Sequence, residues 1–145
     1  MKVYRFSLET VMRIRALEER LAREHLMLAQ RNLRHAHGVF EAAQASLAAL
    51  TVPTGPTTMG DLCWIGDQAD RLAEEVRICH EVVAAAESAR EGFSQAWHLA
   101  RKRLGALERL NVEGLARWKD ESQRQEVAEL DDVANVRHGL VRARS

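Results

Sequence analysis

Apolar residues recur at alternating spacings of three and four residues through the second half of the chain. The positions that follow this spacing are Leu62, Ile65, Ala69, Leu72, Val76, Cys79, Val83, Ala86, Arg90, Phe93, Trp97, Ala100, Leu104 and Leu107. All of them except Arg90 are apolar. A seven-residue repeat held over about seven heptads is typical of a coiled-coil seam, so it predicts one long helix that pairs with another helix. Beyond Leu107 the repeat degrades through Asn111 and Gly114 before it reaches Trp118.

The first part of the chain shows the same spacing. It runs through Ala22, Leu26, Ala29, Leu33, Ala36, Phe40, Ala43, Leu47 and Leu50. Upstream, the apolar stripe is Ile14, Leu17, Leu21 and Leu28, which is offset by one position from the later stripe. Such an offset predicts a stutter that locally unwinds the supercoil. Ser7, followed by Glu9 and Thr10, is the expected N-cap of this helix.

A cluster of helix breakers separates the two patterns at residues 51–60, which hold both prolines of the chain. We therefore expect an all-α fold: one antiparallel coiled-coil hairpin over residues 1–145, whose second helix is longer than the first. The predicted parts are a helix over about 7–50, a linker over 51–60, a helix over about 61–137 and a tail over 138–145. Thr58 and Asp61 are the candidate caps of the second helix.

The unequal lengths of the two predicted helices leave part of the second one over. At 1.5 Å per residue they span roughly 65 Å and roughly 110 Å, so the first helix reaches only to about 103–105 of the second. From there to about 137 we expect no partner within the chain. The apolar residues of this stretch are Leu107, Leu110, Val112, Leu115, Trp118, Val127, Leu130 and Val133. Their exposure on a solitary helix indicates a binding partner.

Charge is balanced overall but segregated along the chain. The 145 residues hold 21 Lys and Arg against 21 Asp and Glu, which argues against a general nucleic-acid binder. Lys and Arg number eight against four acidic residues over 1–35, and six against two over 97–119. They number only three against eight over 61–96 and one against six over 120–134. Two interpretations stay open: solvated helix faces, or a docking surface at the end that carries both termini.

The sequence contains neither a catalytic motif nor a metal-ligand spacing. A glycine-rich phosphate loop and a Gly-x-Ser-x-Gly elbow are both missing. His35 and His37 point to different sides of a helix, and Cys63 and Cys79 are too far apart for a zinc pair, so both cysteines are expected to be free thiols. We expect no enzyme, no cofactor and no metal. The first ten residues lack the apolar core of a signal peptide, which favours a cytoplasmic protein without membrane insertion.

Both ends of the chain resemble the flagellar export protein FliJ family. Residues 6–19 read Phe-Ser-Leu-Glu-Thr-Val-Met-Arg-Ile-Arg-Ala-Leu-Glu-Glu, similar to the Phe-x-Leu opening and the Arg- and Glu-rich helix of that family. Residues 121–134 resemble its closing Glu-Gln-Lys-Glu-Leu-Asp-Glu-hydrophobic-Ala segment, except that Val127 and Ala128 stand where the family tends to have Gln and Lys. Length, unequal helices and central linker are similar as well.

The resemblance implies a non-enzymatic component of the flagellar type III protein export apparatus. Family members resemble the central stalk of rotary ATPases, and they bind the hexameric export ATPase, the cytoplasmic domain of the membrane export gate and export chaperones. The implied location is cytoplasmic, peripherally associated with the export apparatus at the inner membrane, and no nucleic acid is implied. Two alternatives stay open: the stalk protein of a virulence-type type III secretion system, and a generic coiled-coil scaffold or homodimer.

Two sets of contact residues follow from the resemblance together with the predicted overhang. The candidate contacts with the ATPase are Phe6, Leu8, Val11, Arg15, Trp118, Glu129, Leu130, Asp131 and Asp132. The candidate contacts with the export gate, assigned by family analogy alone, are Phe40, Leu47, Leu72 and Val76.

Overall fold

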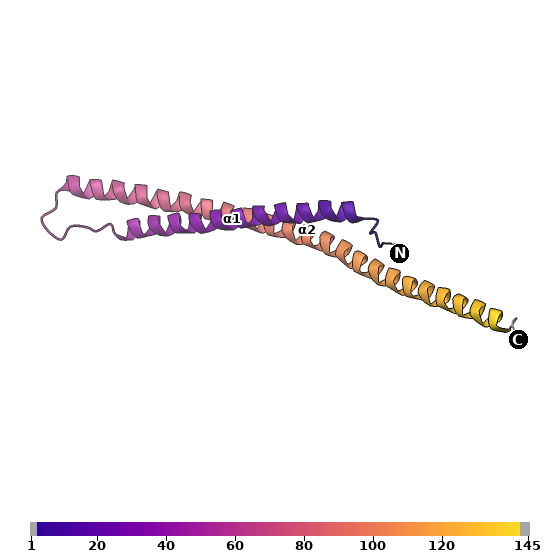
Figure 1. Ribbon diagram of the computed structural model, residues 1–145. Coiled ribbons are helices and arrows are strands. Elements are labelled where there is room, and N and C mark those ends of the chain that lie inside the picture. Colours follow the sequence, from indigo (N-terminus) through magenta and orange to yellow (C-terminus); the bar gives the residue numbers. More distant parts are fainter. Residues whose placement is uncertain (1–2, 143–145) are drawn as a thin grey trace. The chain divides into compact units, whose positions relative to one another are not determined.

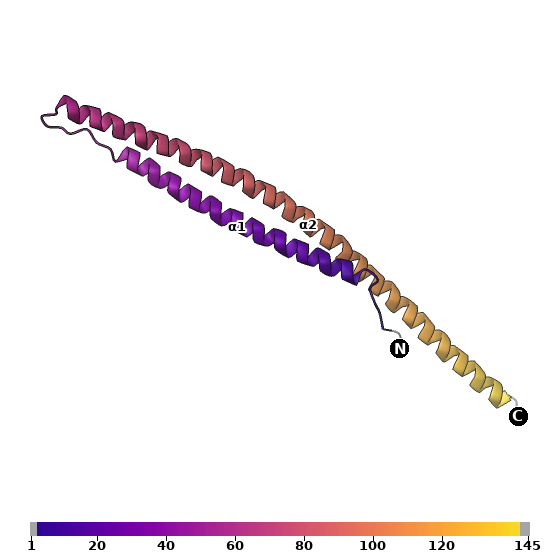
Figure 2. The same cartoon turned by 90° about the horizontal axis from the view of Figure 1, so that it is seen from above.

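The computed structural model describes residues 3–142 and contains two long helices, α1 (Glu9–Ala48) and α2 (Met59–Arg142). The helices are antiparallel, and α2 is about twice as long as α1, with 84 residues against 40. Figures 1 and 2 show them joined by the loop that holds Pro53 and Pro56. The prediction of an all-α, two-helix coiled-coil hairpin with a longer second helix is confirmed.

The start of α2 is fixed by a reciprocal cap between Thr58 and Asp61. The Asp61 amide donates to the Thr58 hydroxyl at 3.2 Å, while the Thr58 amide and hydroxyl donate to the Asp61 carboxylate at 3.0 and 2.7 Å. This arrangement is a capping box, which satisfies amides that have no partner inside the helix. The bonds from Thr58, that of its hydroxyl above all, lower the pKa of the Asp61 carboxyl.

The other helix ends differ from the predicted bounds by a few residues. The first helical bond of α1 runs from the Met12 amide to the Leu8 carbonyl, which places Leu8 rather than Ser7 at the N-cap. At its far end α1 stops at Ala48, two residues before the predicted limit. The second helix continues to Arg142, into the stretch expected as a tail, of which residues 143–145 lie outside the described part.

Contacts divide the chain into two units. The hairpin unit comprises Glu18–Ala100, and the terminal unit comprises Met1–Leu17 together with Arg101–Ser145. Each unit contains a piece of α1 and a piece of α2. The hairpin unit holds the loop, and the terminal unit holds both ends of the chain.

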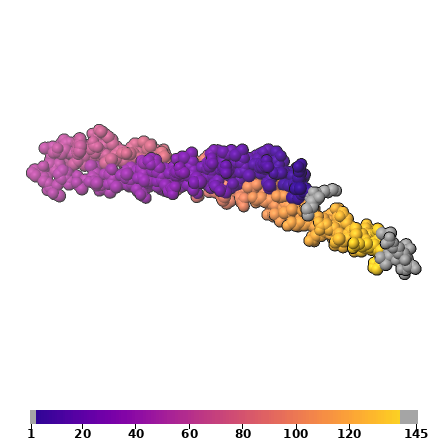
Figure 3. All heavy atoms as spheres, viewed as in Figure 1, coloured from indigo at the N-terminus to yellow at the C-terminus, as the bar shows by residue number. Residues whose placement is uncertain are grey.

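In the hairpin unit, most residues that face the partner helix belong to the predicted repeat, and Glu19 joins them from outside it. Its most buried apolar side chains are Ala29, Ala36, Ala43 and Val83. The space-filling view in Figure 3 shows the two helices in contact along this unit. Because these buried residues are small, the helices approach closely, but each residue removes little apolar surface from water.

Contacts across the seam establish the antiparallel register of the hairpin unit. Partner numbers fall along α2 as they rise along α1. The pairs are Glu19 with Trp97, His25 with Phe93, His37 with Glu87, and Phe40 with His80. The Trp97 indole N–H donates to the Glu19 carboxylate at 2.9 Å, and Arg23 pairs with the same oxygen at 2.6 Å. Glu19 is 6% exposed, so a charged side chain occupies the seam with its partners supplied.

The predicted stutter in α1 is wrong. Upstream of Ala22 the less exposed positions are Glu19, Arg15 and Met12, which continue the spacing of three and four without a break. The apolar residues Ile14, Leu17 and Leu21 are exposed instead. The heptad register of α1 therefore holds to its N-terminal end, and the upstream apolar stripe lies outside the seam.

Candidate partner-binding surface

The N-terminal segment before α1 packs on α2 within the terminal unit. The Tyr4 hydroxyl lies 3.2 Å from both the carbonyl oxygen and Oδ1 of Asn111 and donates to this pair of acceptors. Its ring lies 6.1 Å from that of Trp118, with a tilt of 51° between the planes. Two aromatic rings tilted in this way at this separation attract each other. Tyr4 thus holds the nonhelical N-terminal segment against the side of α2.

Gly114 makes room for this contact. A Cβ at position 114 would lie 2.6 Å from the Tyr4 hydroxyl oxygen, closer than two such atoms approach. Glycine in the middle of a helix is unfavourable by about 1 kcal/mol relative to alanine, so the position needs a compensating contact. Asn111 and Gly114, which interrupt the apolar repeat, are the two residues that accommodate Tyr4.

The predicted overhang begins later than the sequence suggested. We expected α2 to lack any partner within the chain from about 103–105 onward, but Leu104 is buried and Trp118 is half-buried against Tyr4. Half-buried positions continue as far as Ser122. The prediction counted only the helical part of the first arm and missed the nonhelical segment that precedes it.

Beyond Ser122 the side chains of α2 are exposed as far as residue 138. The large apolar residues among them are Val127, Leu130, Val133 and Val136. Leu130 is 69% exposed. A helix with exposed aliphatic side chains and an acidic composition is suited to bind a partner that covers the apolar stripe.

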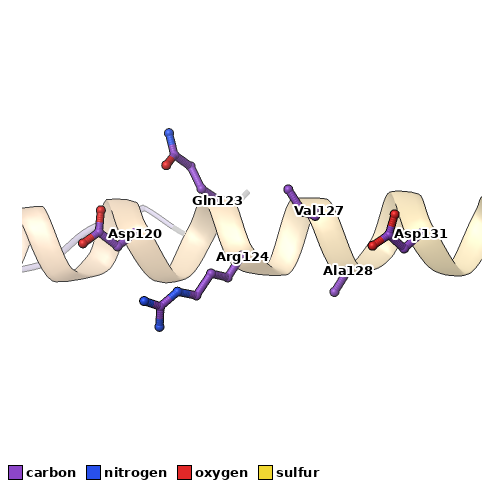
Figure 4. Close-up of a pocket in the computed structure, with 6 residues that line it drawn as sticks. All are labelled: Asp120, Gln123, Arg124, Val127, Ala128 and Asp131. Carbon is purple, nitrogen blue, oxygen red and sulfur yellow. The ribbon is translucent and has the colours of Figure 1, made fainter.

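A shallow depression of about 450 Å³ lies on this part of α2. Figure 4 shows the residues around it, all on the one helix: Asp120, Gln123, Arg124, Val127, Ala128 and Asp131. Its lining combines two carboxylates, one guanidinium and one amide with the small apolar side chains of Val127 and Ala128. Such a surface fits a protein side chain better than an enclosed small molecule.

The candidate ATPase contacts all belong to the terminal unit, but they differ in exposure. Leu8, Val11 and Leu130 are exposed, as are the acidic residues Glu129, Asp131 and Asp132. Phe6, Arg15 and Trp118 are half-buried. Arg15 falls on the seam spacing of α1, so its substitution would disturb helix pairing as well as any external contact.

The candidate export-gate contacts occupy the seam of the hairpin unit. Phe40, Leu47, Leu72 and Val76 are all half-buried at the spacing that faces the partner helix. The Phe40 ring lies 5.7 Å from that of His80 on α2. These four side chains therefore hold the two helices together, whatever else they contact.

Sequence reasoning missed Tyr4 as a site residue. The available signal was a pair of coincidences: the single tyrosine of the chain lies just before the first helix, and a glycine occupies a seam position of the second. Neither feature indicates which residue it contacts until the two helices are aligned.

The side chains that could ligate a metal or act as nucleophiles are not gathered at one place in the described part of the chain. No group of three or more His, Cys, Asp or Glu residues is arranged to hold a metal ion within residues 3–142. Cys63 is exposed and Cys79 is half-buried, and both are free thiols. In the same part of the chain, neither helix has a stretch long and apolar enough to cross a membrane.

Comparison with known proteins adds no relative: no protein-family model, curated protein or solved structure matches the chain.

Proposed function

We propose that this chain is a non-enzymatic stalk component of a flagellar type III protein export apparatus, and that its terminal unit binds the hexameric export ATPase. The observation that carries the proposal is the construction of that unit. Tyr4 fastens the N-terminal segment to α2 through Asn111 and Trp118. Beyond it, α2 continues with exposed aliphatic side chains such as Leu130. The segments that resemble the FliJ family at both ends of the sequence thus belong to one unit.

Charge in the terminal unit supports a docking role. Arg13, Arg101, Lys102 and Arg103 are exposed basic residues, and the stretch 120–134 is acidic. A basic surface would be steered toward an acidic ring lumen, and such steering weakens as the salt concentration rises. Binding to the ATPase is therefore expected to weaken with added salt.

The remaining partners follow from the resemblance. The export gate and the export chaperones would engage the hairpin unit, and the complex would sit at the inner membrane by association with the gate. A virulence-type secretion stalk would share every feature described above. Flagellar genes beside the gene for this chain would favour the flagellar system, and secretion genes would favour the other.

The test is ATP hydrolysis by the purified hexameric export ATPase with and without the chain. Leu130→Asp places a charge on the exposed apolar stripe without touching the seam, so helicity by circular dichroism should be kept while stimulation falls by about tenfold or more. Met27→Asp is the matched control, because Met27 is an exposed apolar residue of the hairpin unit. It should stimulate like the unaltered chain.

The proposal is wrong if the unaltered chain neither binds nor stimulates the ATPase. The docking surface is misassigned if Leu130→Asp stimulates as well as the Met27→Asp control.

A further inference from the structure

The two sides of the hairpin unit differ in chemistry. In an antiparallel pair of helices, heptad positions that flank the seam on one side of the first helix lie beside the equivalent positions of the second. On one side these positions hold His25, Leu28, Asn32, His35 and Val39 of α1 and Val82, Ala85 and Ala89 of α2. We call these eight residues the groove face. Its α2 residues are all apolar, and its α1 residues combine Leu28 and Val39 with two histidines and Asn32.

The opposite side is polar. His37 of α1 lies 3.7 Å from Glu87 of α2 there, and Arg23, Arg34 and Glu91 occupy neighbouring flanking positions. Met27 is an exposed apolar side chain on that side. A hairpin surrounded by water on both sides has no reason to be apolar on one of them.

The groove face is hollowed. Two adjoining depressions of about 410 and about 320 Å³ run along it and share Asn32, Val82 and Ala86. Both are lined by α1 and α2 together. The small side chains Ala85, Ala86 and Ala89 line the second depression together with Leu28 and Val82, which are 55% and 53% exposed.

The seam alone buries little apolar surface. No large side chain within residues 3–138 is fully buried, and the most buried apolar residues are mostly alanines. The larger aliphatic side chains of the groove face remain in water, and the unfavourable free energy of each grows with its exposed apolar area. The hairpin unit therefore has an incomplete core with one uncovered side.

We propose that the groove face is covered by the groove face of a second copy of this chain, which gives a dimer with a four-helix core. From Ile78 to Leu99 the apolar flank of α2 spans roughly 30 Å, and two helices side by side are roughly 20 Å wide. Facing surfaces of that size remove roughly 1,200 Å² from water in total, the lower limit of a stable specific interface. Facing hollows lined by alanine let the projecting Leu28 and Val82 of each copy enter the other.

Charge selects one of the two symmetric arrangements. Over residues 61–96 α2 carries three Lys and Arg against eight Asp and Glu, whereas α1 carries four against four over residues 18–48. Placing α2 on α2 of the second copy would bring two acidic helices together, which is unfavourable. Placing α1 on α2 of the second copy avoids this. All neighbouring helices are then antiparallel, as in up-and-down four-helix bundles.

This dimer goes beyond the proposed function and does not depend on it. The groove face shares no residue with the candidate ATPase contacts, so either proposal can fail without the other.

The test is sedimentation equilibrium of the full chain. The unaltered chain should reach twice its 16.4 kDa monomer mass, with a dissociation constant on the order of 10 µM. Leu28→Glu should raise this constant by about tenfold or more. Met27→Glu is a closely matched control, since Met27 is the neighbouring residue, is 47% exposed against 55% for Leu28, and lies on the polar side. It should leave the dissociation constant unchanged.

A monomer at all concentrations up to about 200 µM would overturn the proposal. So would a dimer that Leu28→Glu leaves intact, or one that Met27→Glu weakens equally. Circular dichroism checks that Leu28→Glu remains helical, and Val82→Glu on α2 provides the second variant if it does not.

The arrangement is tested by disulfide formation between copies in which Cys63 and Cys79 have been replaced. A chain with His35→Cys mixed with a chain with Ala85→Cys should form the mixed disulfide faster than either forms a disulfide with itself. Faster pairing of His35→Cys with itself would place α1 on α1 and overturn the arrangement.

Discussion

Replacing Gly114 with alanine should reveal whether Tyr4 packs on α2. In an exposed helix the change would stabilise the protein by about 1 kcal/mol, because alanine loses less backbone entropy than glycine. Here the new Cβ would lie 2.6 Å from the Tyr4 hydroxyl oxygen and displace it. The displaced hydroxyl gives up its hydrogen bond to Asn111, which is worth about 1 kcal/mol. The two effects cancel, so Gly114→Ala alone should change the free energy of unfolding very little.

The same change should stabilise a chain that already carries Tyr4→Phe. Without the hydroxyl, the ring atom nearest to the new Cβ lies at 3.6 Å, an ordinary van der Waals distance. No hydrogen bond remains to be lost, so alanine should contribute its full benefit of about 1 kcal/mol. Urea unfolding of the unaltered chain, the two single variants and the double variant completes a double-mutant cycle with a coupling of about 1 kcal/mol. Hydrogen exchange of the amides at 108–118 gives a local readout of the same effect.

Equal stabilisation by Gly114→Ala in the two backgrounds would refute the reasoning. It would mean that the Tyr4 hydroxyl does not lie over Gly114 in solution.

Three further predictions concern the hairpin unit. Trp97→Phe keeps an aromatic side chain but removes the indole N–H that donates to the buried Glu19. Urea denaturation should therefore show a loss of about 2 kcal/mol in the free energy of unfolding, part of which Glu19→Leu restores in the double variant. An NMR titration should show a pKa for the Asp61 carboxyl below the ordinary value of an aspartate, and Thr58→Ala should raise this pKa. Because the folded pKa is the lower one, the stabilisation by this cap is complete above the ordinary pKa of Asp and is lost as pH falls through the lowered one. Ala36→Leu should overpack the seam and lower the free energy of unfolding by about 1–3 kcal/mol in thermal melts. Unchanged stability of this variant would contradict the burial of Ala36.

The seam could be predicted where the apolar repeat was unambiguous. From Ile65 to Leu107 the positions spaced by three and four are half-buried or buried, apart from Phe93, and the same holds in α1 from Ala22 to Leu47. A coiled coil leaves little freedom there, since a shift by one position would expose every apolar side chain.

The register of α1 before Ala22 could not be predicted from hydrophobicity alone. Ile14, Leu17 and Leu21 are more apolar than the residues that face the seam, yet the pairing with α2 continues in phase. Glu19 is tolerated because the Trp97 indole and Arg23 supply its partners, and neither is visible until the two helices are aligned. The upstream apolar residues are then left on the surface.

The candidate site was predictable only in part. Exposed apolar residues on the last part of α2 followed from the difference in helix length, and Leu130 and Val133 are indeed exposed. The position of Tyr4 could not be predicted from the sequence, because a nonhelical segment has no hydrophobic periodicity that would indicate its contacts. Its contact with Trp118 shortens the uncovered part of α2.

The most direct test of the proposed stalk function is the number of chains that bind one ATPase ring. The purified chain is titrated into the hexameric export ATPase, and the complexes are weighed by native mass spectrometry. A stalk enters the ring along its axis, so binding should saturate well below one chain per ATPase subunit, and Leu130→Asp should abolish it. Failure to form any complex, or saturation at one chain on every subunit, would contradict the account.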